Sequence, residues 1–212
     1  MSNYRRRLIK EACTPYATSG LVLLYTKNGI SGSTWKNEGS GGSALDGAIT
    51  GTFNTDHITL NGSTDYIKTG AIDWGECTIE ISFALKQFIA GFIMDARDSS
   101  GKGYQPAYFN PYKVETYSSK ASGENQCKIS LNTLSKNTLT AIYSSSKIAS
   151  YINASNKTEI DVDSIVSYTE NLYIGVRHSF TSFSNIDVYA VRVYNRALSD
   201  DEITRNYNTD KL

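Results

Sequence analysis

Residues 186–203, IDVYAVRVYNRALSDDEI, combine the pattern of a β-strand with the start of a helix, and this stretch decides the fold. Apolar side chains alternate along its first half, as they do in strands. The alternation places Ile186, Val188 and Ala190 on one face and Tyr189, Val191 and Val193 on the other. Because both faces are apolar, we expect a further element to cover the outer face of this strand.

The second half of the stretch has the sequence of a helix N-terminus. Ser199 can accept a hydrogen bond from the first turn, and Glu202, three residues later, can reach back to the N–H of Ser199. Leu198 and Ile203 flank this capping box in the positions of a hydrophobic staple. These signals predict a short helix over residues 200–207.

The chain from Gly20 onward consists of short β-type runs separated by turns rich in Gly, Ser, Asn and Asp. We expect strands at 21–26, 57–61, 66–69, 77–85, 89–95, 105–109, 113–117, 126–132, 138–143, 147–152, 158–162, 172–176 and 185–194. The Gly/Ser-rich segment 31–47 is predicted to be a long irregular loop. This spacing indicates an all-β sandwich of two antiparallel sheets over residues 20–212, which follows a basic N-terminal arm, residues 1–19.

Composition and charge exclude several classes of partner. The 212 residues carry a formal net charge of zero, so we do not expect the chain to bind nucleic acid. No apolar run approaches the roughly 20 residues of a membrane span, so membrane insertion is not expected. The opening MSNYRRRLIK lacks the apolar region of a secretory signal, and we expect the chain to be made in the cytoplasm without a signal peptide.

Several segments resemble, in the same order, the motifs of the laminin-G-like (concanavalin A-like) jelly roll. ITLNGSTDYIKTG (58–70) and CTIEISFAL (77–85) resemble the opening hairpin of that family and the strand that follows it. SKIASYINAS (146–155) and LYIGVR (172–177) resemble two later strands, and the stretch quoted first resembles the closing strand and helix. The resemblance covers roughly residues 20–208 and implies a two-sheet jelly-roll sandwich with a short C-terminal helix.

The resemblance implies a non-catalytic recognition module, and we expect it to bind a glycan such as host cell-surface polysaccharide through loops of the sandwich. The opening residues also resemble those of virion-associated proteins in phages of gut bacteria. On this interpretation residues 1–19 attach the chain to other virion proteins, and the sandwich lies on the virion surface. A purely structural virion domain that makes only protein–protein contacts is an alternative. Fibre and adhesin proteins are often trimers, so an oligomer is compatible with this setting.

Candidate ligand residues come from the aromatic and basic side chains. A tyrosine ring can contact the apolar face of a sugar while its hydroxyl makes hydrogen bonds. Tyr104 and Tyr108 are candidates of this kind, although core packing would also explain them. Trp35 is expected to be exposed in the loop at 31–47, and Arg97 and His178 follow the ends of predicted strands, where they can line a binding rim.

A calcium site is the expected cofactor site. The segment MDARDSSGKGY (94–104) contains Asp95 and Asp98 in a Gly-containing turn, and carboxylate oxygens are the ligands that calcium prefers. The family resemblance supports this prediction, because many laminin-G-like domains bind calcium. A polar hairpin turn is the alternative.

We do not expect the chain to be an enzyme, but one segment offers a catalytic alternative. TEIDVD (158–163) places Glu159, Asp161 and Asp163 on one face of a strand. Glycosidases of the same superfamily use a strand motif of this type, and retaining hydrolysis needs two carboxyl groups about 5–5.5 Å apart. The alternatives are therefore a glycoside hydrolase that uses Glu159 and Asp163, or an edge strand whose charges discourage pairing with other chains.

Overall fold

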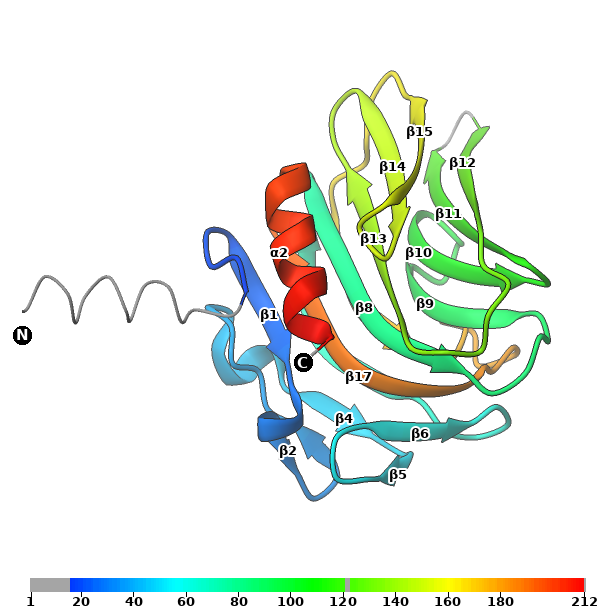
Figure 1. The fold of residues 1–212 in the computed structure, drawn as a ribbon. Helices are drawn as coiled ribbons and strands as arrows, with labels where there is room; N and C mark the ends of the chain where they lie inside the picture. Colours follow the sequence, from blue (N-terminus) through cyan, green and yellow to red (C-terminus); the bar gives the residue numbers. More distant parts are fainter. Residues whose placement is uncertain (1–15, 121–122, 212) are drawn as a thin grey trace, which may run out of the picture.

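The computed structural model describes residues 16–120 and 123–211, which form two antiparallel β-sheets packed face to face (Figure 1). The all-β sandwich predicted from the sequence is confirmed. Of the predicted N-terminal arm, residues 1–15 lie outside the described residues. No helix among the described residues is both long and apolar enough to cross a membrane.

The first sheet has eight strands among the described residues. Their order is β15 (Asn156–Asp161), β14 (Lys147–Ile152), β13 (Asn137–Tyr143), β8 (Cys77–Leu85), β17 (Asn185–Tyr194), β6 (Ile58–Asn61) and β5 (Thr52–Phe53). β1 (Leu21–Tyr25) pairs with the second half of β17, while β6 pairs with its first half. The closing strand predicted from the sequence therefore lies in the middle of this sheet, between β8 on one side and β1 and β6 on the other.

The second sheet has nine strands in the described part of the chain. Their order is β12 (Gly123–Ser130), β11 (Lys113–Lys120), β10 (Gly103–Asn110), β9 (Gly91–Arg97), β16 (Tyr168–Ile174), β7 (Ile67–Trp74), β4 (Gly47–Ile49), β3 (Thr34–Trp35) and β2 (Ile30–Ser31). The prediction of an irregular loop over 31–47 is wrong in part, because this segment contains β3 and the 3₁₀-helix η2 (Gly42–Leu45). A further 3₁₀-helix, η1 (Lys27–Gly29), connects β1 to β2.

A single apolar core fills the space between the sheets. β8 is buried over its whole length, because one of its faces lies in this core and the other is covered from outside. A β-bulge in β17 between Val188 and Ala190 changes the side-chain alternation there. As a result Val188 and Val191 both lie in the inner core, and the alternation predicted for them, on opposite faces, is wrong.

Helix α2 (Asp200–Asp210) covers the outer face of the eight-stranded sheet and lies across β8 and β17 in Figure 1. The predicted capping box is confirmed: the Ser199 hydroxyl accepts from the Glu202 N–H at 3.3 Å, and the Ser199 N–H donates to the Glu202 carboxylate at 3.0 Å. Leu198 and Ile203 pack with Tyr194 in a second, smaller core beneath the helix. The cover expected for the outer face of the closing strand is thus this helix.

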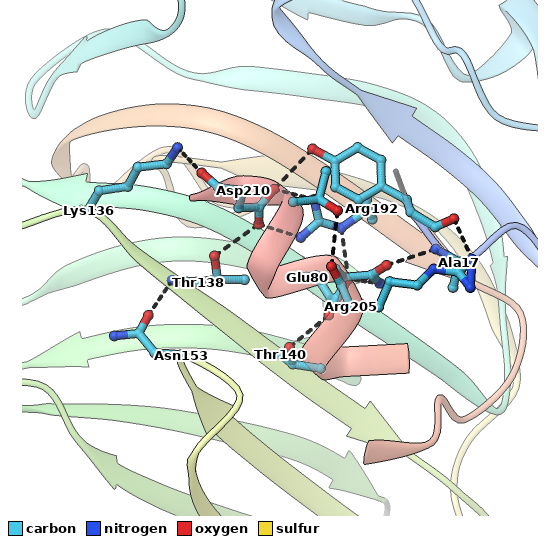
Figure 2. A network of polar contacts seen from close by, with 12 residues as sticks. Ala17, Glu80, Lys136, Thr138, Thr140, Asn153, Arg192, Arg205 and Asp210 are labelled. Atoms are coloured by element: carbon cyan, nitrogen blue, oxygen red, sulfur yellow. Dashed lines mark hydrogen bonds and ion pairs between the residues drawn. The ribbon is translucent and has the colours of Figure 1, made fainter. Parts of the chain in front are cut away.

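A fully buried arginine joins the helix to the sheet (Figure 2). Arg192, on the outer face of β17, donates from Nε to Glu80 at 2.8 Å, and its Nη1 and Nη2 each donate to Asp210 at 2.7 Å. Thr140 donates to Glu80 at 2.9 Å, and Thr138 donates to Asp210 at 2.9 Å. Burial raises the pKa of Asp210, but the charge of Arg192 and the hydrogen bonds from Arg192, Thr138 and Tyr16 together outweigh burial and hold this pKa below its usual value.

The same network holds the first described residues. Asn206 accepts from the Ala17 N–H at 2.8 Å and donates to Glu80 at 2.7 Å. The Tyr16 hydroxyl donates to Asp210 at 3.0 Å, and the Tyr16 ring lies 4.4 Å from the Arg192 guanidinium carbon. Two residues of the segment predicted as an arm therefore pack as part of the domain.

Replacing Arg192 tests this network. Arg192→Met should lower the free energy of unfolding by about 3–5 kcal/mol, because it leaves two carboxylates buried without their cation. Urea denaturation measures the effect. The control is Lys36→Met, which removes an exposed ion pair with Asp46 at 2.7 Å and should cost less than about 1 kcal/mol. Equal losses in the two variants would contradict the role given to Arg192.

The helix cap should make stability depend on pH. Hydrogen bonds from Arg196 outweigh partial burial, and with the Ser199 N–H they lower the pKa of Glu202 from 4.5 to about 2. Because this pKa is depressed in the folded state, its stabilisation is present above pH 4.5 and is lost as the pH falls toward 2. Glu202→Gln keeps a capping-box residue without the charge, so it should lower the melting temperature at pH 6 but not near pH 2. If the melting temperatures of Glu202→Gln and the unmodified chain differ by the same amount at every pH, the stabilisation does not come from the charge of Glu202.

Candidate functional site

Two of the predicted ligand residues lie in the core. Trp35 is fully buried, so the expectation of an exposed indole is wrong. The pairing of β3 with β2 turns this side chain inward, where it stacks on Tyr25 with ring centroids 5.0 Å apart. Its indole N–H donates to the Thr26 carbonyl at 2.6 Å. The ring is therefore not available to a ligand at the surface.

Tyr104 is fully buried as well, so the prediction that its ring contacts a surface ligand is wrong. Its ring stacks on Tyr143 at 3.9 Å and meets Tyr168 edge-on at 5.4 Å. Its hydroxyl donates to the Val166 carbonyl at 2.8 Å, and burial raises the pKa of this phenol. This tyrosine packs the core, as the alternative interpretation of the sequence allowed.

The other three predicted ligand residues meet on one surface, the outer face of the nine-stranded sheet. β9 and β10 are neighbours, and Tyr108 pairs with Phe92 across them. Asp95, three residues farther along β9, pairs with Tyr173 of β16. Arg97 ends β9, and His178 follows β16, so the sheet register brings both side chains to Asp95.

Asp95 fixes these two side chains in place. Its carboxylate is completely buried and accepts from Arg97 Nε at 2.8 Å and Arg97 Nη2 at 3.1 Å. It also accepts from the His178 backbone N–H at 3.0 Å, and it lies 2.7 Å from His178 Nδ1. A buried, fully hydrogen-bonded ion pair of this kind holds its members in one geometry.

Phe92 lies at the centre of the surface. Its ring centroid is 4.8 Å from that of Tyr108, 5.2 Å from the Arg97 guanidinium carbon and 5.7 Å from that of Arg177. Cations over an aromatic face are stabilised by the charge distribution of the ring. We call Phe92, Arg97, Tyr108, Arg177 and His178 the Phe92 cluster. The sequence analysis did not predict Phe92 or its contact with two arginines.

A second aromatic group adjoins the Phe92 cluster across β16. Tyr173 meets Phe180 edge-on at 5.6 Å, and Phe180 meets Tyr66 at 5.1 Å. Lys68 lies 5.4 Å from the centre of the Tyr173 ring. Phe180 is 44% exposed, so part of this group is open to solvent. Since Tyr173 pairs with Asp95, the two groups form one continuous strip of aromatic and basic side chains.

The strip lies on the side of the sandwich away from α2. The helix covers the outer face of the other sheet, and in the described part of the chain no α-helix lies over β9, β10 and β16 (Figure 1). Cavities of about 330 Å³ and 380 Å³ lie elsewhere, one beside Lys27 and Tyr189 and the other beside Leu45 and Trp74. Among the described residues, therefore, no helix covers the strip; Phe180 is its exposed member, while Phe92 and Tyr173 are each 8% exposed.

The two predicted calcium ligands do not form a metal site. The Asp95 carboxylate is already bound by Arg97 and His178, and a neighbouring guanidinium opposes a cation. Asp98 Oδ1 accepts from the Ser100 N–H and the Lys102 N–H, both at 2.9 Å, and so closes the hairpin turn. Among the described residues, no three acidic, histidine or cysteine side chains converge as metal ligands. These donors do not fit calcium, and the polar-turn alternative holds for Asp98.

The predicted catalytic segment lies on an edge strand. Glu159, in β15, is ion-paired with Lys147 at 2.7 Å and Lys157 at 2.8 Å, and these contacts lower its pKa to about 2. A carboxyl group with this pKa is ionised at neutral pH and does not serve as a general acid there. β15 ends at Asp161, so Asp163 lies beyond the strand, and the prediction of three acids on one strand face is wrong. The arrangement is that of a charged edge strand.

Comparison with known families and structures gives a consistent result. A family model described as the concanavalin A-like lectin/glucanases superfamily matches residues 61–204. The binding domain of botulinum neurotoxin DC in complex with SialylT has a TM-score of 0.72 at 10% identity, and the match covers 91% of this chain and 52% of that one. The same domain in complex with rat synaptotagmin II has a TM-score of 0.71 at 10% identity, with 90% and 52% covered.

An enzyme shares the fold as well. Trypanosoma rangeli sialidase in complex with sialic acid has a TM-score of 0.67 at 14% identity, and the match covers 91% of this chain and 33% of that one. This chain thus spans about half the length of the neurotoxin domains and a third of the sialidase. No curated protein sequence matches the chain. At these identities the likeness shows the fold alone.

Asp95→Asn tests the anchoring of the Phe92 cluster. The substitution keeps the shape of the side chain but removes the charge that pairs with Arg97, so the free energy of unfolding should fall by about 3 kcal/mol. The control is Asp98→Asn, which keeps an oxygen acceptor for the turn and should cost less than about 1 kcal/mol. Chemical denaturation of both variants measures the difference. Equal stability of the two variants would show that Asp95 does not hold the cluster.

Proposed function

This chain belongs to the concanavalin A-like lectin/glucanases superfamily, and we propose that it is a non-catalytic recognition module that binds carbohydrate on the outer face of its nine-stranded sheet. The observation on which the proposal rests is the Phe92 cluster, in which Asp95 holds Arg97 and His178 beside the half-buried ring of Tyr108. Three of the five ligand residues predicted from the sequence belong to it.

The chemistry of the cluster suits a sugar. An aromatic ring can contact the C–H face of a pyranose, while guanidinium N–H groups donate to its hydroxyl oxygens. Asp95 occupies Nε and Nη2 of Arg97, whereas Nη1 has no partner among the described residues. A donor held rigidly beside an aromatic ring loses little conformational entropy on binding.

The neighbouring aromatic group supports a ligand longer than one sugar. Tyr173, Phe180 and Tyr66 continue the strip beyond Asp95, and Lys68 adds a further donor beside Tyr173. A strip that continues across several strands suits an oligosaccharide or polysaccharide chain that lies across them. We therefore propose that the ligand is a polysaccharide of a host cell surface.

The structural relatives support a binding role. The neurotoxin domains are binding domains, one in complex with SialylT and another with rat synaptotagmin II, and the sialidase is in complex with sialic acid. Because one relative is an enzyme, the absence of catalysis is part of our proposal. It is supported by the end of β15 at Asp161, which leaves Asp163 off the strand that carries Glu159.

The proposed setting is the surface of a phage virion, with residues 1–19 as the attachment to other virion proteins. The resemblance of the opening residues to virion-associated proteins supports this setting. A structural domain that makes only protein–protein contacts is the second candidate. It is supported by the neurotoxin binding domain, which is similar in fold and is in complex with the protein rat synaptotagmin II.

A glycan array followed by calorimetry tests the proposal. The full chain should bind at least one oligosaccharide, and Tyr108→Ala should weaken that binding by roughly 10-fold, the effect of losing about 1.4 kcal/mol. The control is Tyr112→Ala, which removes a 59% exposed ring at the β10–β11 turn and should leave binding unchanged. If the protein binds no glycan on the array, the carbohydrate-binding proposal is contradicted and the protein-contact alternative is favoured. Release of reducing sugar from a bound glycan would contradict the non-catalytic part.

A further inference from the structure

Arg177 belongs to the Phe92 cluster, and its charge has no counterpart among residues 16–120 and 123–211. Its guanidinium lies over the Phe92 ring, and no hydrogen bond or ion pair joins it to a side chain of the described residues. Its Nε is buried and lacks a hydrogen-bond partner in this part of the chain. A buried N–H without a partner is costly, so a site of this kind gains when an acceptor binds there.

The backbone around Arg177 is well ordered by hydrogen bonds. Its N–H donates to the Ser182 carbonyl at 3.0 Å, and its carbonyl accepts from the Phe180 N–H at 2.8 Å. An isolated bridge pairs Val176 with Phe183 beside it. The loop therefore fixes the backbone of Arg177, and the guanidinium lies 5.7 Å from the centre of the Phe92 ring.

Two acidic groups of the same sheet face, beside the Phe92 cluster, are already paired with basic side chains. Asp95 is bound by Arg97 and His178. Glu115, which pairs with Tyr108 across β10 and β11, is held by Lys128 at 3.2 Å. Burial raises the pKa of Glu115, but its hydrogen bonds, with that to Lys128 the strongest, outweigh burial and keep this pKa below its usual value. Neither carboxylate is left to pair with Arg177.

A second buried donor on this face also lacks a partner. Gln105 is 3% exposed, and its Nε2 has no hydrogen-bond partner among the described residues. Gln105 pairs with Tyr117 and Tyr108 pairs with Glu115 in the register of β10 and β11. A β-bulge between Gln105 and Tyr108 therefore brings both side chains to the same face of the sheet. The positive charge of Arg177 is thus left without a carboxylate partner among the described residues of this face, which suits an anionic ligand.

We infer that the Phe92 cluster selects an anionic saccharide, with Arg177 as the specificity-determining residue that contacts the carboxylate of an acidic sugar. The planar guanidinium matches a carboxylate in two parallel hydrogen bonds, while Tyr108 contacts the apolar face of the ring. The formal net charge of the chain is zero, so attraction to a polyanion must arise locally at this cluster. The inference rests on the proposed function and narrows its ligand.

Matched polymers test the inference. Polygalacturonate, alginate and hyaluronate are each compared by calorimetry with their carboxyl-reduced forms, which keep the sugar backbone and lose the charge. At least one acidic polymer should bind, and its reduced form should bind at least roughly 10-fold more weakly, as expected for a lost charged hydrogen bond. Binding of the acidic form should also weaken as NaCl is raised from about 50 to 500 mM. Dextran sulfate, a sulfated polyanion, should bind more weakly than the carboxylated polymer. If the two bind with equal affinity, the cluster attracts any polyanion and the inference is overturned.

Variants locate the effect at Arg177. Arg177→Gln should weaken binding of the acidic polymer roughly 10-fold. Arg177→Lys keeps the charge but loses the planar guanidinium, so its affinity should lie between that of the unmodified chain and that of Arg177→Gln. The control is Lys211→Gln, which removes one positive charge beside Tyr207 on α2, over the other sheet, and should change nothing. Melting temperatures establish that each variant folds. If Arg177→Gln does not fold, Arg177→Lys still locates the effect, and competition of galacturonate against galactose for the unmodified chain tests the selection of a carboxylate.

The outcomes separate this inference from the proposed function. Equal binding of the native and reduced polymers, lost in Tyr108→Ala, overturns the anionic ligand and leaves carbohydrate recognition standing. Equal losses in Arg177→Gln and Lys211→Gln overturn the role of Arg177 as well. No binding to any acidic or neutral polymer overturns both proposals.

Discussion

The guanidinium of Arg192 is buried between carboxylates from distant parts of the chain, and the outer layer of the domain depends on this contact. Glu80 comes from β8 and Asp210 from the last turn of α2. Three charged groups removed from water are stable only when each finds its full set of partners. Thr138, Thr140 and Asn206 complete that set. The position of the helix is therefore set by paired charges as well as by the small apolar core beside them.

Much of the fold could be predicted from the sequence because its signals are local. The capping box at Ser199 needs only four consecutive residues, and the strands β8, β14 and β17 begin and end at the predicted residues. The failures come from contacts between distant segments. Trp35 lies in a Gly/Ser-rich stretch that has no strand pattern, and its burial depends on stacking with Tyr25. The β-bulge between Val188 and Ala190 could not be predicted from the sequence either, since it arises from pairing with β8.

The candidate site shows the same division. Arg97, Tyr108 and His178 were chosen one by one for their chemistry, and only the pairing of β9 with β10 and β16 brings them together. Asp95 had a local signal that points to its real role. It stands two residues before Arg97 on one strand face, where opposite charges pair. Sequence spacing cannot show that the Asp95 carboxylate is already bound by Arg97 and His178. Phe92 had no signal beyond its place in an apolar strand.

The hydrogen bonds of Tyr16 and Ala17 to the last turns of α2 bring the two ends of the described chain to one place. That place is on the far side of the sandwich from the Phe92 cluster. Polypeptide joined at either end would leave the domain from the same place, beside the last turns of α2. A domain with this geometry can be inserted into a surface loop of another protein, or circularly permuted, without any linker crossing its exposed strip.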